Sequence, residues 1–255
     1  MQRNNHTKFI LTPIAGVLKD SVNACKGISD SIETQPLSEY IYQTTFLKMT
    51  GASEQKLKCI CWEIATFDYD YRYQMLSKPL GECSSFEDKK NVFRDILKAI
   101  INLHPSYDFG ALFTKEMKQE LIENVRRNII SVIEGTILST WEARSFLQFK
   151  SNPIVINKEI DHKSFANNTL DNKAKMPCSF LENDLMEYYK TVVYRHRNRC
   201  AHNLRSYQNN LPTLKTLMSK NYECGHYFNI FFVLILMDVL YMTLYKEYLS
   251  ILKSI

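Results

Sequence analysis

Residues 230–245 read IFFVLILMDVLYMTLY, an apolar run that Asp238 and Thr243 interrupt. Its uninterrupted part, Ile230–Met237, is far shorter than the roughly 20 apolar residues that a helix needs to span a bilayer. A helix that is apolar on all its faces is typical of the interior of a helical protein. The run therefore predicts a buried core or interface helix over about 227–252, and we expect no membrane partner.

Working outward from this run, apolar residues recur at helical spacing along most of the chain. One helical pattern begins at Pro36 and is interrupted at 49–52, and another runs over about 115–149 with a bend expected at Gly135. The chain has 7 Gly and 7 Pro in 255 residues, too few for the frequent turns of a β-sandwich or barrel. We expect an all-α fold of long antiparallel helices.

Two helix starts follow the capping-box pattern, in which Ser is followed three residues later by Glu. Ser84–Glu87 predicts a helix through about Leu103, and Ser179–Glu182 predicts a helix over 180–203.

The chain divides by composition into two regions. Residues 1–35 are mixed and polar, and we interpret them as an N-terminal extension with one short helix around 14–30. Residues 36–255 then form the helical domain. Within it, residues 150–177 are rich in Asn, Lys and Asp and predict a long polar loop, a feature that is commonly functional or mobile.

Positive charge is concentrated late in the chain, although the net charge is only +5. No acidic residue lies between Glu187 and Glu223. A local positive field of this kind attracts polyanions such as RNA. A solvated basic helix end is the alternative, because cations favour helix C-termini. The cations of this segment are Lys190, Arg195, Arg197, Arg199, Arg205, Lys215 and Lys220.

The cysteines and the N-terminus bear on compartment and cofactors. The cysteines are seven in number, form no CxxC pair and lie mostly in apolar, helical context, which indicates reduced thiols rather than a disulfide framework or a zinc site. The N-terminus lacks the architecture of a signal peptide. We expect a cytoplasmic protein without metal or cofactor.

The helix predicted around 185–203 has two chemically different faces at 100° per residue. One face carries Arg197, Asn198 and His202, with a small Ala201 and Tyr194 beside them. The other is the predicted core face: Leu185, Met186, Tyr189, Val192, Val193, His196 and Cys200.

An arginine, an amide and a histidine on one face suit the cleavage of a phosphodiester. RNA cleavage removes a proton from the ribose 2′-hydroxyl, stabilises charge on a five-coordinate phosphate and protonates the leaving 5′-oxygen. Histidine titrates near neutral pH and transfers protons, and the guanidinium group matches phosphate oxygens as a bidentate fork. We assign proton transfer to His202, phosphate stabilisation to Arg197 and positioning to Asn198.

These residues carry a family resemblance. Arg197-Asn198-x-x-x-His202 matches the RNxxxH form of the Arg-x4–6-His motif of the HEPN superfamily, and the motif stands near the end of a late helix before a final apolar helix, as in that family. The resemblance implies an HEPN-like helical bundle and a metal-independent endoribonuclease that acts as a homodimer, with two motifs paired in one composite site. It also implies a toxin, abortive-infection or antiviral-defence effector that acts on tRNA or mRNA and is controlled by an antitoxin or defence partner.

Other polar residues receive secondary roles, each with an ordinary alternative. We assign RNA-backbone contacts to Arg195, Arg199, Asn203 and Arg205, with solvated charge as the alternative. In some HEPN relatives an acidic residue orients the motif arginine, and Glu54 and Asp238 are the candidates here. An exposed helical glutamate, and an ion pair or cap for a buried aspartate, are the alternatives.

Two other functions are compatible with the sequence. One is a non-catalytic HEPN module that binds nucleotide, RNA or a partner protein. The other is a helical structural protein whose last helix forms an oligomer interface. We interpret His196, on the core face, as a hydrogen-bonded core residue rather than a catalyst.

Overall fold

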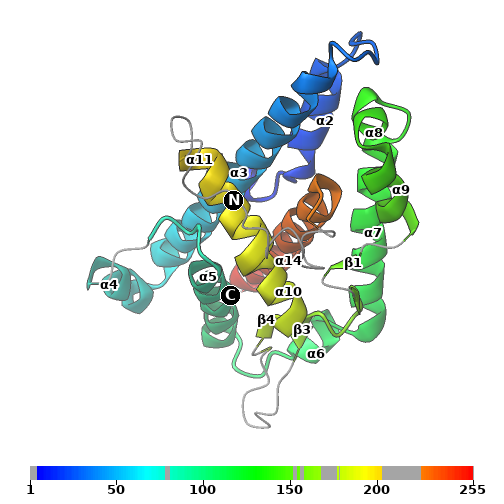
Figure 1. The fold of residues 1–255 in the computed structure, drawn as a ribbon. Coiled ribbons are helices and arrows are strands. Elements are labelled where there is room, and N and C mark those ends of the chain that lie inside the picture. The colour runs from blue at the N-terminus through cyan, green and yellow to red at the C-terminus, as the bar shows by residue number, and fades with distance from the viewer. Residues whose placement is uncertain are drawn as a thin grey trace.

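The computed structural model describes residues 5–77, 81–151, 154–155, 158–167, 177, 179–202 and 225–254. This part of the chain is essentially all-α, as the hydrophobic periodicity predicts (Figure 1). In chain order its elements are α1 (Asn5–Ile10), α2 (Ala15–Ala24), α3 (Gln35–Phe67), α4 (Tyr69–Ser77), α5 (Phe86–Leu103), α6 (Phe109–Leu112), α7 (Lys115–Ile133), α8 (Ile137–Trp141), α9 (Ala143–Ser151), β1 (Ile154–Val155), β2 (Lys158–Glu159), β3 (Phe165–Asn167), β4 (Ser179–Leu181), α10 (Asn183–Tyr188), the π-helix η1 (Tyr189–Tyr194), α11 (Arg195–His202) and α14 (Tyr227–Ser254).

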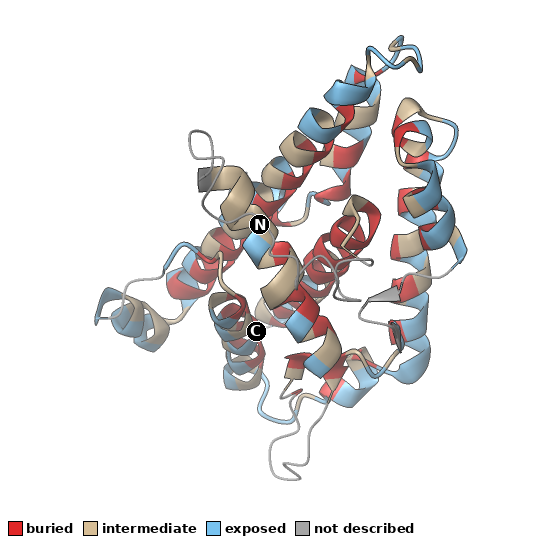
Figure 2. Cartoon of the chain, viewed as in Figure 1, coloured by how far each residue is buried: buried red, intermediate tan, exposed pale blue. Residues whose placement is uncertain are grey.

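The apolar helix α14 forms the centre of the molecule. It runs through the middle of the fold and packs against α3, α5, α7 and α9 (Figure 1). Nearly every residue from Phe228 to Tyr245 is buried, on all sides of the helix (Figure 2). The helix is long and apolar enough to cross a bilayer, but 83% of its most apolar window is buried inside the protein. This burial fits the predicted core helix, since a spanning helix would expose that surface to lipid.

The N-terminal residues pack into the same core. Helices α1 and α2 both lie against α3, and α2 also contacts α7. Ile10, Ile14 and Leu18 are buried in the cluster that contains the α14 side chains. The segment predicted as an extension therefore covers part of the core of the helical region.

Two glycines behave differently from their predicted roles. The interruption expected at 49–52 is wrong, because α3 passes through Gly51 without a break. The bend expected at Gly135 is a complete break: α7 ends at Ile133, Gly135 adopts φ +72° and α8 begins at Ile137. A positive φ is compatible with glycine but not with a continuing helix, whereas packing against several helices tolerates the helical Gly51.

Both capping-box predictions need correction. The cap of α5 is Ser85, whose side chain accepts from the N–H of Asp88, one residue later than predicted. Ser179–Leu181 is not a helix start but strand β4, paired antiparallel with β3 so that Phe165 faces Leu181. The helix begins only at Asn183. The backbone groups of Ser179–Leu181 are satisfied by pairing with β3, so this segment stays extended instead of starting the helix.

The region predicted as a loop over 150–177 contains regular structure in its described residues. Helix α9 extends into it to Ser151, β1 and β2 form a short antiparallel pair, and β3 follows. The remaining residues of that prediction, 152–153, 156–157 and 168–176, lie outside the described residues.

Candidate active site

The helix that carries the motif contains a π-helical segment. Helix α10, η1 and α11 follow one another directly, and η1 ends immediately before Arg195. Tyr188 and Tyr189 are both buried, as is Val193. A π-helix has more residues per turn than an α-helix, so a 100° wheel does not keep its phase from α10 across η1 to α11. The buried Tyr188 is absent from the predicted core face. Such segments occur frequently at functional sites.

Arg197 is held by an acidic residue from another helix. Its Nη2 donates to Oε2 of Glu54 on α3 at 3.2 Å, and its Nη1 donates to Oδ1 of Asn198 at 3.4 Å. The side chains of Arg197 and Glu54 are 23% and 13% exposed, so solvent screens the pair only partly. Glu54 is therefore not an exposed helical glutamate. Because a guanidinium has five N–H donors, Arg197 has donors left for a ligand.

The other motif and basic residues lie at the end of the same helix. His202 is the last residue of α11, and its side chain lies outside the part of the chain that the structure describes, as do Asn203 and Arg205. Arg195 is exposed to solvent. Arg199 is half-buried, with its Nη2 3.5 Å from Nδ1 of His196. The structure therefore brings Arg197, Asn198 and Glu54 together, and places the backbone of His202 one helical turn beyond Asn198.

His196 is a neutral anchor of α11. Tyr227 donates its hydroxyl proton to Glu39 (2.9 Å), so Nε2 of His196 must donate to the Tyr227 oxygen at 3.0 Å. The ring stacks on Phe46 with centroids 4.9 Å apart. Burial, together with the charge of Arg199, lowers the pKa of His196 to about 4, although Glu39 acts in the opposite direction. The imidazole is thus uncharged near pH 7, in agreement with the predicted hydrogen-bonded core residue.

Asp238 does not orient a motif arginine. Its Oδ1 accepts from Nζ of Lys56 at 2.6 Å, and its Oδ2 accepts from the backbone N–H of Ile14 at 2.9 Å. The two side chains are 2% and 5% exposed, so the alternative of a buried ion pair is confirmed and the orienting role is wrong. Lys56 lies two residues after Glu54, so this pair fixes the part of α3 that faces Arg197.

Comparisons with protein-family models, with curated proteins and with solved structures find no match to this chain.

A buried lysine accompanies the ion pair. Lys89 on α5 is 2% exposed, donates from Nζ to the carbonyl oxygen of Cys83, and lies 5.8 Å from the centre of the Tyr189 ring. The pKa of Lys89 is lowered to about 8, mainly by burial; the charge of Arg197 acts in the same direction and the negative charge of Glu54 opposes it. Glu54 thus contacts Arg197 directly and acts on Lys89 through its charge.

The burial of Lys89 could have been predicted from its position on the apolar face of α5, although the helix prediction did not single it out. The apolar face of α5 includes Phe86, Phe93, Ile96 and Ile100, and Lys89 lies on it, three residues after Phe86 and four before Phe93. A lysine on an apolar stripe is seldom buried unless its charge is compensated. By contrast, no local pattern marks the contact between Glu54 and Arg197, which are 143 positions apart.

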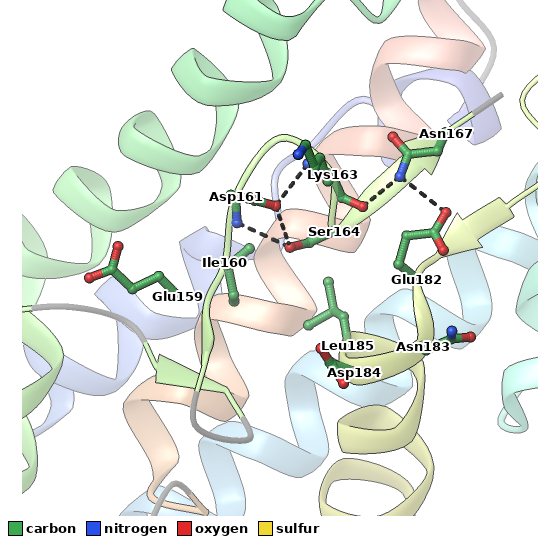
Figure 3. A pocket seen from close by; sticks show the side chains of 10 residues that line it. All are labelled: Glu159, Ile160, Asp161, Lys163, Ser164, Asn167, Glu182, Asn183, Asp184 and Leu185. Atoms are coloured by element: carbon green, nitrogen blue, oxygen red, sulfur yellow. Dashed lines mark hydrogen bonds between the residues drawn. The ribbon is translucent and has the colours of Figure 1, made fainter. Parts of the chain in front are cut away.

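A cavity of about 500 Å³ lies elsewhere, between the β2–β3 connection and the start of α10 (Figure 3). Four carboxylates and a single lysine, Lys163, line it, so its charge opposes phosphate binding. Several of these groups hydrogen-bond to one another or to nearby backbone, including Asn167 to Glu182 at 3.1 Å and the N–H of Lys163 to Asp161 at 2.8 Å. The α11 surface suits a polyanion better. Within the described ranges, no three His, Cys, Asp or Glu side chains gather to hold a metal ion.

The burial of Lys89 predicts a pH effect on stability. An unfolded lysine has a pKa near 10.4, so between about pH 8 and pH 10 the unfolded chain keeps a proton that folded Lys89 has lost. The free energy of unfolding of the wild type should therefore rise with pH relative to Lys89→Met, by up to about 1.4 kcal/mol per pH unit. Chemical denaturation across this pH window measures the unfolding free energy of both proteins. The contributions of all other titrating groups cancel in the difference between the two values. Lys98→Met, at an exposed position of α5, is the control and should show no such slope. A flat difference for Lys89→Met would contradict the prediction.

Proposed function

We propose that this protein is an endoribonuclease of the HEPN type, built on an HEPN-like helical bundle. The observation that carries the proposal is the shielded pair of Arg197 and Glu54, 3.2 Å apart, on the helix that ends at His202. The pair presents an oriented guanidinium inside a segment with no acidic residue of its own. An arginine held in this way is suited to binding a phosphate that gains charge during a reaction.

The proposed reaction is cleavage by the ribose 2′-hydroxyl. A base removes the 2′-proton, the 2′-oxygen attacks the adjacent phosphorus, and the bond to the 5′-oxygen breaks as an acid protonates that oxygen. The products carry a 2′,3′-cyclic phosphate and a 5′-hydroxyl. Because the nucleophile belongs to the substrate, the reaction requires no metal-activated water, so the proposal includes neither metal nor cofactor.

Arg197 and Asn198 have distinct parts in this proposal. Arg197 places its free N–H groups on the non-bridging phosphate oxygens, where negative charge develops. Glu54 restricts the Arg197 side chain to one rotamer, so less side-chain conformational entropy is lost when substrate binds. Asn198, whose Oδ1 accepts from Arg197, has an amide N–H₂ without a partner among the described residues, which can hold a phosphate oxygen.

A second copy of the chain completes the proposed site. The reaction needs both a base and an acid, but each chain offers a single motif histidine, His202. His196 cannot serve as the second group, because burial holds its pKa at about 4 and both ring nitrogens face fixed neighbours. Two α11 helices related by a two-fold axis would supply both groups.

Action on tRNA or mRNA, a toxin or antiviral-defence role and control by an antitoxin or defence partner stay predictions of the family resemblance.

Cleavage of a single-stranded RNA in the presence of EDTA tests the proposal. The wild type should produce fragments with cyclic phosphate and 5′-hydroxyl ends, and His202→Ala should not, because proton transfer is lost. His104→Ala is a matched control: this exposed histidine caps the C-terminus of α5 and should be dispensable.

Each alternative function corresponds to another result. RNA binding without cleavage by either protein would indicate a non-catalytic HEPN module. Absence of both binding and cleavage would favour a helical structural protein. Equal cleavage by the wild type and His202→Ala would remove the assigned role of His202.

A further inference from the structure

Lys58 provides a partly exposed cation near the Arg197–Glu54 pair, in addition to the buried Lys89. It lies four residues after Glu54 on α3, so both side chains leave the same face of the helix one turn apart. Lys58 Nζ donates to Oε2 of Glu82 at 2.7 Å. The hydrogen bond from Lys58 lowers the pKa of Glu82, and the charge of Arg197 also lowers it, which places Arg197 within electrostatic reach of this second pair.

The chain around Glu82 is anchored to the core beside the site. The next residue, Cys83, is buried and adopts φ +57°, and its carbonyl oxygen accepts from Nζ of Lys89. The carbonyl oxygen of Ser84 accepts from the hydroxyl of Tyr189 at 3.0 Å. A non-glycine residue with positive φ persists only where its surroundings impose it. The backbone next to Glu82 is therefore held by Lys89 and Tyr189, two buried residues of the core.

The two side chains differ in exposure in a way that permits exchange. Glu82 is 82% exposed, whereas Lys58 is 33% exposed. An ion pair this open to solvent contributes little to stability, so an incoming anion displaces the carboxylate at low cost. A phosphate presents the same oxygen acceptors as the carboxylate and binds an ammonium as a point charge.

We propose that Lys58 binds the RNA phosphate next to the one held by Arg197, and that Glu82 occupies the Lys58 ammonium until RNA displaces it. The proposal rests on the proposed function, since it requires RNA to lie along α11. In this proposal Glu82 competes with RNA for Lys58. Lys58 is then a phosphate-binding residue on α3, far in sequence from the basic segment around Arg197.

Binding of a 2′-O-methyl single-stranded RNA oligonucleotide, followed by fluorescence polarisation, tests the proposal without cleavage, because this RNA lacks the 2′-nucleophile. Lys58→Gln should weaken binding roughly 5- to 10-fold, and the slope of log affinity against log salt should fall in magnitude by about 0.7, the loss of one phosphate contact. Glu82→Gln should tighten binding about 2- to 3-fold, because the competitor is removed.

The double variant Lys58→Gln/Glu82→Gln isolates the pair. It should bind close to Lys58→Gln alone, because Lys58 is the cation that Glu82 contacts directly, at 2.7 Å, and most of its competition acts through that contact. Lys150 and Glu134 form another exposed pair, on α9 and after α7, and serve as the matched control. Lys150→Gln and Glu134→Gln should change affinity and salt slope much less than the variants at Lys58 and Glu82.

Unchanged RNA affinity of Lys58→Gln would overturn the inference. A gain in affinity from Glu82→Gln that is equally large in the double variant would also overturn it, because such a gain would be a general effect of removing negative charge. If the wild type binds this RNA and the Lys58 effects are present while natural RNA is not cleaved, the inference stands and the catalytic proposal fails. If the wild type binds no RNA, both fail.

Discussion

Replacing Arg197 by alanine is expected to slow RNA cleavage by about 10²- to 10³-fold under single-turnover conditions with EDTA. This is the range seen when one preorganised donor to a developing oxyanion is removed. In the structure, no other arginine side chain in the described residues contacts Glu54, so the lost guanidinium has no ready replacement. The effect should fall on the rate of the chemical step, since the charge on the phosphate grows in the transition state.

Two further variants show whether charge or geometry matters at this position. Arg197→Lys keeps the charge but loses the bidentate fork, and should recover only part of the rate. Arg127→Ala removes a 65% exposed arginine of α7 and should cleave like the wild type. Thermal unfolding of each variant checks the fold. Cleavage by a folded Arg197→Ala protein within about 3-fold of the wild-type rate would refute the role of Arg197.

Replacing Asp238 by alanine is expected to cause the largest loss of stability among the variants considered. The substitution leaves the buried ammonium of Lys56 without its 2.6 Å partner and the N–H of Ile14 without its acceptor. Removing one member of a buried ion pair costs about 3–5 kcal/mol of unfolding free energy. For a chain of this size, that is a fall in melting temperature of roughly 10 °C.

A double substitution distinguishes the unpaired charge from the lost packing. In Lys56→Met/Asp238→Leu both charges are replaced by apolar groups of similar volume, and most of the lost stability should return. Calorimetry or urea denaturation of the wild type, the single variants Lys56→Met and Asp238→Leu, and the double variant completes the cycle. A loss below about 1 kcal/mol for Asp238→Ala would show that the pair is not buried in solution.

Much of the helical architecture was predictable because it depends on local chemistry. Thr114 caps α7, as expected for a threonine before an apolar-periodic segment, and its side chain accepts from the N–H of Met117. The failures occurred where local signals compete with contacts made elsewhere. Ser179–Glu182 has the letters of a capping box, but β3 offers backbone partners that no local pattern contains.

The candidate site was predictable only in part. The motif Arg197-Asn198-x-x-x-His202 is contiguous, so its residues could be named from the sequence. The choice between Glu54 and Asp238 as partner of Arg197 could not be made in this way, because an exposed glutamate and a buried, paired aspartate fitted the sequence equally well. The π-helical turn before Arg195 also changes which residues face the core.

The amino-acid sequence alone determined the helical class, the central place of the final apolar helix and the position of the basic motif, because hydrophobic periodicity and charge spacing act over a few neighbouring residues. The tertiary structure decided the partners: Glu54 for Arg197, Lys56 for Asp238, Tyr227 for His196 and Glu82 for Lys58. These contacts join residues 24 to 182 positions apart. Their free energies depend on burial and distance, and both quantities exist only after the helices have packed around α14.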